Sequence, residues 1–190
     1  MIHPIEQESY RILESRVDLS HLGPLSRAVV ARIIHASADL DFATTTVTDE
    51  VALEGAVDAL RAGAPVITDV EMVRAGITGV ATECFLDRAT AQGERTRSAH
   101  AMSLAVEAHP RGAVFVVGCA PTALFELLRL DVEPALVVGL PVGFVGAAES
   151  KDALRASGLP AVSNIGEKGG SAVAAAALNA LVRIASTERR

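Results

Sequence analysis

The chain has 190 residues, enough for one domain with a sizeable core and short for two, so we expect a single domain over residues 1–190. Half of the residues are apolar, which excludes a largely disordered chain. The net charge of −6 offers no basic surface for nucleic acid or for an anionic membrane, so we expect neither as a partner.

Long uncharged runs raise the mean hydropathy to +0.36. None of these runs reaches the roughly 18–20 apolar residues that a membrane-spanning helix needs. The N-terminus, MIHPIEQESY, lacks the basic segment and apolar stretch of a signal peptide. Cys84 and Cys119 are the only cysteines, and neither has a metal-ligand partner at close spacing. We therefore expect a cytoplasmic protein without a metal site.

Three helices are predicted in the first third of the chain. Apolar residues recur at helical spacing over residues 5–17 and again over residues 25–38, where Val29 and Ile33 fall on the buried side. A third helix is predicted over residues 49–62, and we expect it to end there because the next residue is a glycine, a common helix stop signal.

Short apolar runs then alternate with helical patterns. Strands are predicted over residues 65–70, 82–86, 113–117, 135–138 and 160–163. Helices are predicted over residues 71–75, 97–108, 122–130, 147–156 and 170–185. This alternation predicts an α/β fold, with a mostly parallel sheet of about five strands covered by helices on both faces.

Glycines and small polar residues gather where three of these strands end. The segments are GCAPTALF after Val117, GLPVGFVGAAES after Val138 and NIGEKGGSAVAAA after Ser163. Ligands of parallel sheets bind beyond the carboxyl ends of the strands, where helix N-termini favour anions. The glycine spacing matches neither a nucleotide-binding nor a dinucleotide-binding loop. Spacing alone therefore predicts an α/β ligand-binding domain.

His35 is the strongest single candidate for chemistry. It lies in RIIHASADLDF, within the apolar stripe of the second predicted helix. A core histidine with locally satisfied nitrogens is one reading of this pattern. The other is a proton carrier, because Arg32 at i−3 could bind an acid, and Asp39 at i+4 would share the helix face and favour the protonated imidazole if the helix continues through it. If the helix ends near Ala36 instead, Asp39 is a cap or loop residue without reach to the imidazole.

Three further groups lie at expected strand ends or helix starts. Thr68 and Asp69 end the first predicted strand, although Asp69 could simply cap the next helix. Arg97 and Ser98 open a helix and could bind an anion or serve as a solvated charge and a cap. The segment Lys168-Gly169-Gly170-Ser171 opens the last helix, and a tight turn with a cap would explain its glycines but not its lysine.

Several segments, taken together, closely resemble the precorrin-8X methylmutase family. In the second half they are APTALFELL, GLPVGFVGAAESKDAL and KGGSAVAAAALNAL. In the first half, ESYRIL, RIIHAS, TDVEMVRAGI and TRSAHA match the family's blocks in order. The resemblance covers nearly the whole chain and implies a three-layer α/β/α fold.

The resemblance also implies an activity. Members of this family act in cobalamin biosynthesis and move a methyl group from C-11 to C-12 on ring C of a tetrapyrrole. Precorrin-8X becomes hydrogenobyrinate, or cobalt-precorrin-8 becomes cobyrinate, and the product stays tightly bound. The shift needs no cofactor. By family analogy the protein is a homodimer with pockets near the subunit interface.

The family's site residues transfer to matching positions of this sequence. His35 matches the histidine that donates and accepts the proton, and Ser9 and Arg32 match substrate contacts. Substrate-binding roles are also expected for the strand-end and helix-start groups: Thr68, Asp69, Arg97, Ser98, Lys168, Gly169, Gly170 and Ser171. A substrate with many carboxylates fits such scattered anion receptors.

Two positions depart from the family pattern, and two other functions stay open. Cys119 stands where the family has asparagine, and Ala172 follows the Gly-Gly-Ser turn where cobalt-pathway members often carry asparagine. The IIHASADLDF segment and the KGGS turn nevertheless favour the cobalt branch. A non-catalytic tetrapyrrole carrier would need no titratable histidine, and an isomerase of another polyanion would need a smaller pocket.

Overall fold

The computed structural model describes residues 3–91 and 93–187. The helices are α1 (Pro4–Glu14), α2 (Pro24–Ser37), α3 (Phe42–Thr45), α4 (Glu50–Arg61), α5 (Glu71–Gly76), the 3₁₀ helix η1 (Leu86–Arg88), α6 (Arg97–Ala108), α7 (Pro121–Arg129), α8 (Ala147–Ala156) and α9 (Ser171–Thr187). The strands are β1 (Thr46–Thr48), β2 (Val66–Thr68), β3 (Glu83–Cys84), β4 (Val114–Val117), β5 (Leu136–Gly139) and β6 (Ala161–Asn164).

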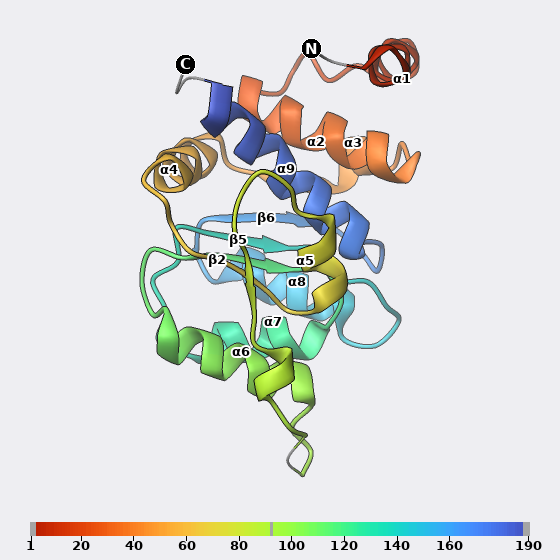
Figure 1. Ribbon diagram of the computed structural model, residues 1–190. Helices are drawn as coiled ribbons and strands as arrows, with labels where there is room; N and C mark the ends of the chain where they lie inside the picture. The colour runs from red at the N-terminus through yellow and green to blue at the C-terminus, as the bar shows by residue number, and fades with distance from the viewer. Residues whose placement is uncertain (1–2, 92, 188–190) are drawn as a thin grey trace.

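The strands form one sheet in the order β1-β6-β5-β4-β2-β3. Every pairing is parallel except that of β1 with β6. All residues of β2, β4 and β5 are buried, as expected for parallel strands covered on both faces. Figure 1 shows α2, α4 and α9 over one face of the sheet and α6, α7 and α8 over the other, which confirms the three layers.

The alanine-rich helix α9 packs unusually close to its neighbours. A Cβ added to Gly76 or to Gly118 would lie 2.8 Å from an alanine Cβ of α9, at Ala175 and Ala174 respectively. Alanine combines high helix propensity with a small side chain, so a helix of this composition can lie close against the sheet and α5. The run of alanines therefore brings the N-terminus of α9 against the ends of the strands.

Most predicted elements are confirmed, and the largest difference lies between residues 38 and 49. There the structure has α3 and the antiparallel edge strand β1, which the sequence reading missed, so the sheet has six strands rather than about five. The missed strand has three residues, two of them threonine, and so carries no apolar run to reveal it. The first helix ends at Glu14 rather than at residue 17.

The parallel strands end along one edge of the sheet, and several of the expected site residues lie near this edge on different elements. Thr68 ends β2, and the segment Lys168–Gly170 links β6 to α9. The strands β6 and β2 are three spacings apart, roughly 14 Å. The Lys168 ammonium contacts Asp39, so the end of α2 lies beside the start of α9.

Candidate active site

His35 lies near the C-terminal end of α2, underneath α1. Its Nδ1 atom is 2.7 Å from the hydroxyl oxygen of Ser9, and both side chains are partly buried. Ser9 is the only hydrogen-bond partner of His35 within the described part of the chain. Since the hydroxyl can donate or accept, it fixes the ring's orientation in either tautomer and leaves Nε2 available for another partner. The two residues expected at the centre of the site are thus brought together.

Tyr10, which the sequence reading missed, completes the packing of the histidine. Its ring is stacked on that of His35, with centroids 5.1 Å apart and planes 13° from parallel. The Tyr10 hydroxyl is also 3.4 Å from Nη1 of Arg32. Tyr10 is the only tyrosine in the chain and directly follows Ser9, which is the signal that could have drawn attention to it.

Arg32 is held by an acidic partner on α1. Its Nη1 donates to Oε1 of Glu6 at 2.6 Å, and Arg183 on α9 donates to the same oxygen at 2.9 Å. Burial by itself would raise the pKa of Glu6, but the hydrogen bonds from the two arginines outweigh it, and the pKa is lowered. One carboxylate facing two guanidinium groups leaves net positive charge one turn from His35.

Asp39 does not interact with His35, so the predicted coupling between them is wrong. The helix ends at Ser37, and Ala38 takes a left-handed conformation with φ of 54°, which turns the chain away. The Asp39 carboxylate instead accepts from Nζ of Lys168 at 2.6 Å. That contact, followed by the backbone N–H of Asp41, lowers the pKa of Asp39.

The turn Lys168–Gly170 is fitted against the end of β5. The N–H of Gly170 donates to the carbonyl of Leu140 at 2.8 Å. A Cβ at Gly169 would lie 2.3 Å from that same carbonyl oxygen, so the close approach requires glycine. The half-exposed Lys168 ammonium lies 2.6 Å from carboxylate oxygens of both Asp39 and Asp41. Ser171 is the first residue of α9, as predicted from the turn.

Asp69 holds the neighbouring turn rather than capping its own helix. Its carboxylate accepts from the backbone N–H groups of Gly118, Cys119 and Ala120, at 3.2, 2.8 and 2.8 Å. Burial raises the pKa of Asp69, and the three hydrogen bonds oppose that effect. An expected anion site is therefore filled by the protein's own carboxylate. Thr68 is buried beside it, and its hydroxyl donates to the carbonyl of Glu83 at 3.3 Å.

Arg97 and Ser98 begin α6, in the helical layer across the sheet from His35. The preceding residue, Thr96, accepts from the N–H of Ala99 and contacts the Thr122 hydroxyl at 2.7 Å, which places this helix start beside that of α7. Arg97 is exposed, and its side chain has no ion-pair partner among the described residues. No hydrogen bond within the described part of the chain links it to the His35 group.

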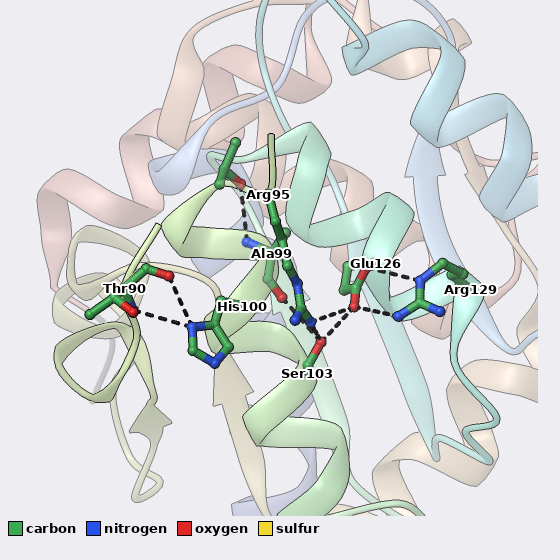
Figure 2. A network of polar contacts seen from close by, with 8 residues as sticks. Thr90, Arg95, Ala99, His100, Ser103, Glu126 and Arg129 are labelled. Atoms are coloured by element: carbon green, nitrogen blue, oxygen red, sulfur yellow. Dashed lines mark hydrogen bonds and ion pairs between the residues drawn. The ribbon is translucent and has the colours of Figure 1, made fainter. Parts of the chain in front are cut away.

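A polar network holds the segment that leads into α6. Figure 2 shows Arg95 and Ser103 converging on Glu126 of α7, with Arg129 on its other side. The Glu126 carboxylate accepts from Arg95 at 2.6 Å and from Arg129 at 2.8 Å. The pKa of Glu126 falls to about 2, chiefly because of Arg129, with Ser103 and Arg95 adding to the effect. The start of α6 is thus tied to α7.

The hollow beside His35 is small. Its volume is about 110 Å³, and Ser9, Ile12, Arg16 and Leu40 are among its lining residues. Two larger hollows, of about 540 and 320 Å³, are both lined by Tyr10, Ala28 and Ala31. Sites for drug-sized ligands occupy roughly 300–1,000 Å³, so the hollow at His35 alone does not enclose a macrocycle.

Two searches of the described residues bear on other kinds of site. Residues 3–91 and 93–187 contain no group of three or more His, Cys, Asp and Glu side chains arranged to hold a metal ion. In the same residues, none of the helices combines the length and the apolar character needed to cross a membrane.

Comparison with known proteins identifies the family. The family model described as CbiC, precorrin-8X methylmutase, matches residues 4–184. The chain belongs to the precorrin-8X methylmutase family. It is 42% identical to the cobalt-precorrin-8 methylmutase of Salmonella typhimurium, over 94% of this chain and 93% of that protein. It is 40% identical to the precorrin-8X methylmutase of a Sinorhizobium species, with the same coverage of both chains.

A solved structure agrees with this assignment. The precorrin-8X methylmutase from Thermus thermophilus superimposes with a TM-score of 0.85 at 36% identity, and the match covers 95% of each chain. The precorrin-8X methylmutase family assignment therefore extends to the fold. In this member of the family, the Ser9 hydroxyl and the His35 imidazole lie within hydrogen-bond distance.

Proposed function

We propose that this chain is a methylmutase that converts precorrin-8X to hydrogenobyrinate, or cobalt-precorrin-8 to cobyrinate, in cobalamin biosynthesis. The reaction moves a methyl group from C-11 to C-12 on ring C of the tetrapyrrole. The observation that carries the proposal is the contact of 2.7 Å between Ser9 and His35, beside a hollow at the protein surface. Relatives of both names have similar identities, 42% and 40%, so the choice between the two substrates is left to experiment.

His35 would lend a proton to a ring nitrogen or a neighbouring carbon and take it back after the methyl group has moved. Substrate and product are isomers, so no atom, electron or net proton is gained or lost. Positioned general acid–base catalysis contributes roughly 10²- to 10⁴-fold to a rate. Ser9 and Tyr10 hold the imidazole in one orientation, which favours this use of it.

The substrate's carboxylates would be bound by cations around this histidine. Arg32 and Arg183 share one acidic partner, and the Lys168 ammonium contacts Asp39, just beyond the end of α2. We also propose that the other expected residues contact the substrate or support its pocket: Thr68, Asp69, Arg97, Ser98 and the Gly169–Ser171 segment. Among them, Arg97 has the most accessible charge.

We propose that two copies of the chain pair to complete the pocket. The hollow of about 110 Å³ at His35 is too small for a macrocycle. Exposed apolar side chains near the strand ends would be covered in a dimer, with Phe144 at 90% and Val145 at 89% exposure. Light scattering on the purified protein should give twice the chain mass, and a monomer at micromolar concentration would contradict the pairing.

The experiment for the function uses purified protein and both tetrapyrroles. Wild type should convert at least one of them to its methyl-shifted isomer, detected by the change in absorbance and by the methyl signals in NMR. The product should remain bound and colour the protein. Binding without conversion would favour the rival carrier function, and absence of both would refute the proposal. We also propose a cytoplasmic location, consistent with the free thiols of Cys84 and Cys119, which cell fractionation would test.

A further inference from the structure

Lys151 on α8 is a lysine enclosed inside the protein. Its exposed fraction is 0%, whereas lysines are almost never fully buried without partners. Its Nζ donates to the carbonyl of Lys168 at 2.6 Å and to Oδ1 of Asn164 at 3.1 Å. Burying an ammonium group costs free energy unless hydrogen bonds offset the lost hydration. These two contacts are therefore what keeps the charged lysine inside the protein.

The contacts of Lys151 converge on the turn that leads into α9. Asn164, at the end of β6, is itself fully buried, and its Nδ2 donates to the same Lys168 carbonyl at 2.9 Å. Two donors therefore hold the backbone at residue 168, immediately before the glycines that pack against Leu140. The Lys168 side chain then reaches Asp39 and Asp41, just beyond the helix that carries His35.

We propose that Lys151 is a positioning residue, whose buried ammonium holds the Lys168–Gly170 turn in the shape that presents the Lys168 ammonium and the start of α9 to the tetrapyrrole's carboxylates. Lys151 does not itself touch the substrate. The kinetic readout of this role rests on the proposed methyl shift, but the conformational readout does not.

The charges around Lys151 make its hold on the Lys168–Gly170 turn, called the clamp below, dependent on pH. Burial, and then the neighbouring Arg155, lower the pKa of Lys151 to about 8, while Asp152 on α8 and Glu167 in the loop after β6 oppose the shift. As pH rises through that value the ammonium becomes a neutral amine, and its hydrogen bonds lose the strength that the charge provides. The turn should therefore loosen between pH 7 and 9.5.

The test compares wild type with Lys151→Met, which keeps a long unbranched side chain and removes the donor. The KM for the tetrapyrrole should rise roughly tenfold or more, as expected for loss of a charged hydrogen bond, while kcat stays within about twofold. Arg155→Met is the matched control, because Arg155 lies on the same helix and donates to the carbonyl of Asn164 but not to that of Lys168. It should leave KM within about twofold of wild type.

Amide hydrogen exchange provides the readout that is independent of substrate. Exchange over residues 165–171 should accelerate roughly tenfold or more in Lys151→Met, while α6 keeps its wild-type protection. Unchanged exchange and unchanged KM would overturn the proposal. A wild type that fails to isomerise either tetrapyrrole would refute the proposed function, and exchange alone would then judge the clamp.

The pH dependence of wild type needs no variant and decides the matter if Lys151→Met does not fold. Exchange over residues 165–171, corrected for the intrinsic effect of pH, should increase between pH 7 and 9.5. KM should rise over the same interval. A flat corrected exchange profile across this range would overturn the proposal.

Discussion

Removal of the Ser9 hydroxyl should impair catalysis more than binding. The Ser9→Ala substitution deletes the atom that lies 2.7 Å from Nδ1 of His35 and leaves the rest of α1 unchanged. The imidazole would still be stacked on Tyr10, so it would stay near its place. The ring would lose the contact that fixes its rotation. In a larger fraction of the substrate complexes, the imidazole would then be misoriented for proton transfer.

The size of the effect follows from that one contact. A typical intramolecular hydrogen bond contributes about 0.5–1.5 kcal/mol, which corresponds to a fall in kcat of roughly 2- to 10-fold. The side chains are only partly buried, so water can solvate Nδ1 in the variant, and the free energy of unfolding should change by less than about 1 kcal/mol. The affinity for the tightly bound product should stay within about twofold of wild type.

Single-turnover conversion of the tetrapyrrole, followed by absorbance, would measure the effect. Ser15→Ala is the matched control, because Ser15 caps the end of the same helix by donating to the carbonyl of Ile12 and makes no contact with His35. The control should convert substrate at the wild-type rate. Equal rates for Ser9→Ala and wild type would refute the orienting role, as would an equal loss of rate in the control.

The remaining predictions concern binding, pH and backbone fit. Arg32→Ala should weaken product binding by about 1.5–3 kcal/mol in an absorbance titration, and unchanged affinity would mean that no carboxylate binds there. Because the pKa of Glu126 is lowered to about 2, its ionised form stabilises the fold fully above about pH 4.5, and this stabilisation is lost as pH falls toward 2. Urea unfolding should therefore show that the difference in free energy of unfolding between wild type and Glu126→Gln shrinks by up to about 3 kcal/mol over that interval. Gly169→Ala should destabilise by at least about 2 kcal/mol, because its Cβ would meet backbone at 2.3 Å, whereas Gly55→Ala in the open middle of α4 should stabilise by about 0.5–1 kcal/mol. Thermal melts would show both signs, and a stabilised Gly169→Ala would contradict the close approach.

Periodicity and turn residues predicted the fold well where elements are long or strongly apolar. The alternation after residue 64 gave the strands β2, β4, β5 and β6 and the helices between them, because strands buried on both faces form continuous apolar runs. The edge strand β1 was missed, because a three-residue edge strand that is only partly buried depends on its neighbour β6 rather than on its own sequence.

The sequence singled out individual side chains of the candidate site but not most of their contacts. The resemblance to the family brought Ser9 and His35 together, and the structure places them in hydrogen-bond distance. The partner of Asp39 could not be read locally, because it depends on a lysine 129 residues away. The same applies to Asp69, whose carboxylate fills a turn 49–51 residues further along the chain. Such contacts are set by the order of strands, which local patterns do not specify.

The measurement that tests the central claim most directly is the conversion of precorrin-8X and cobalt-precorrin-8 by wild type and by His35→Ala. The account predicts that wild type isomerises at least one of them. The variant should fold and bind the coloured corrinoid but turn over more slowly by roughly 10²- to 10⁴-fold. Turnover near the wild-type rate in His35→Ala would contradict the assignment of His35 as the group that lends and recovers the proton.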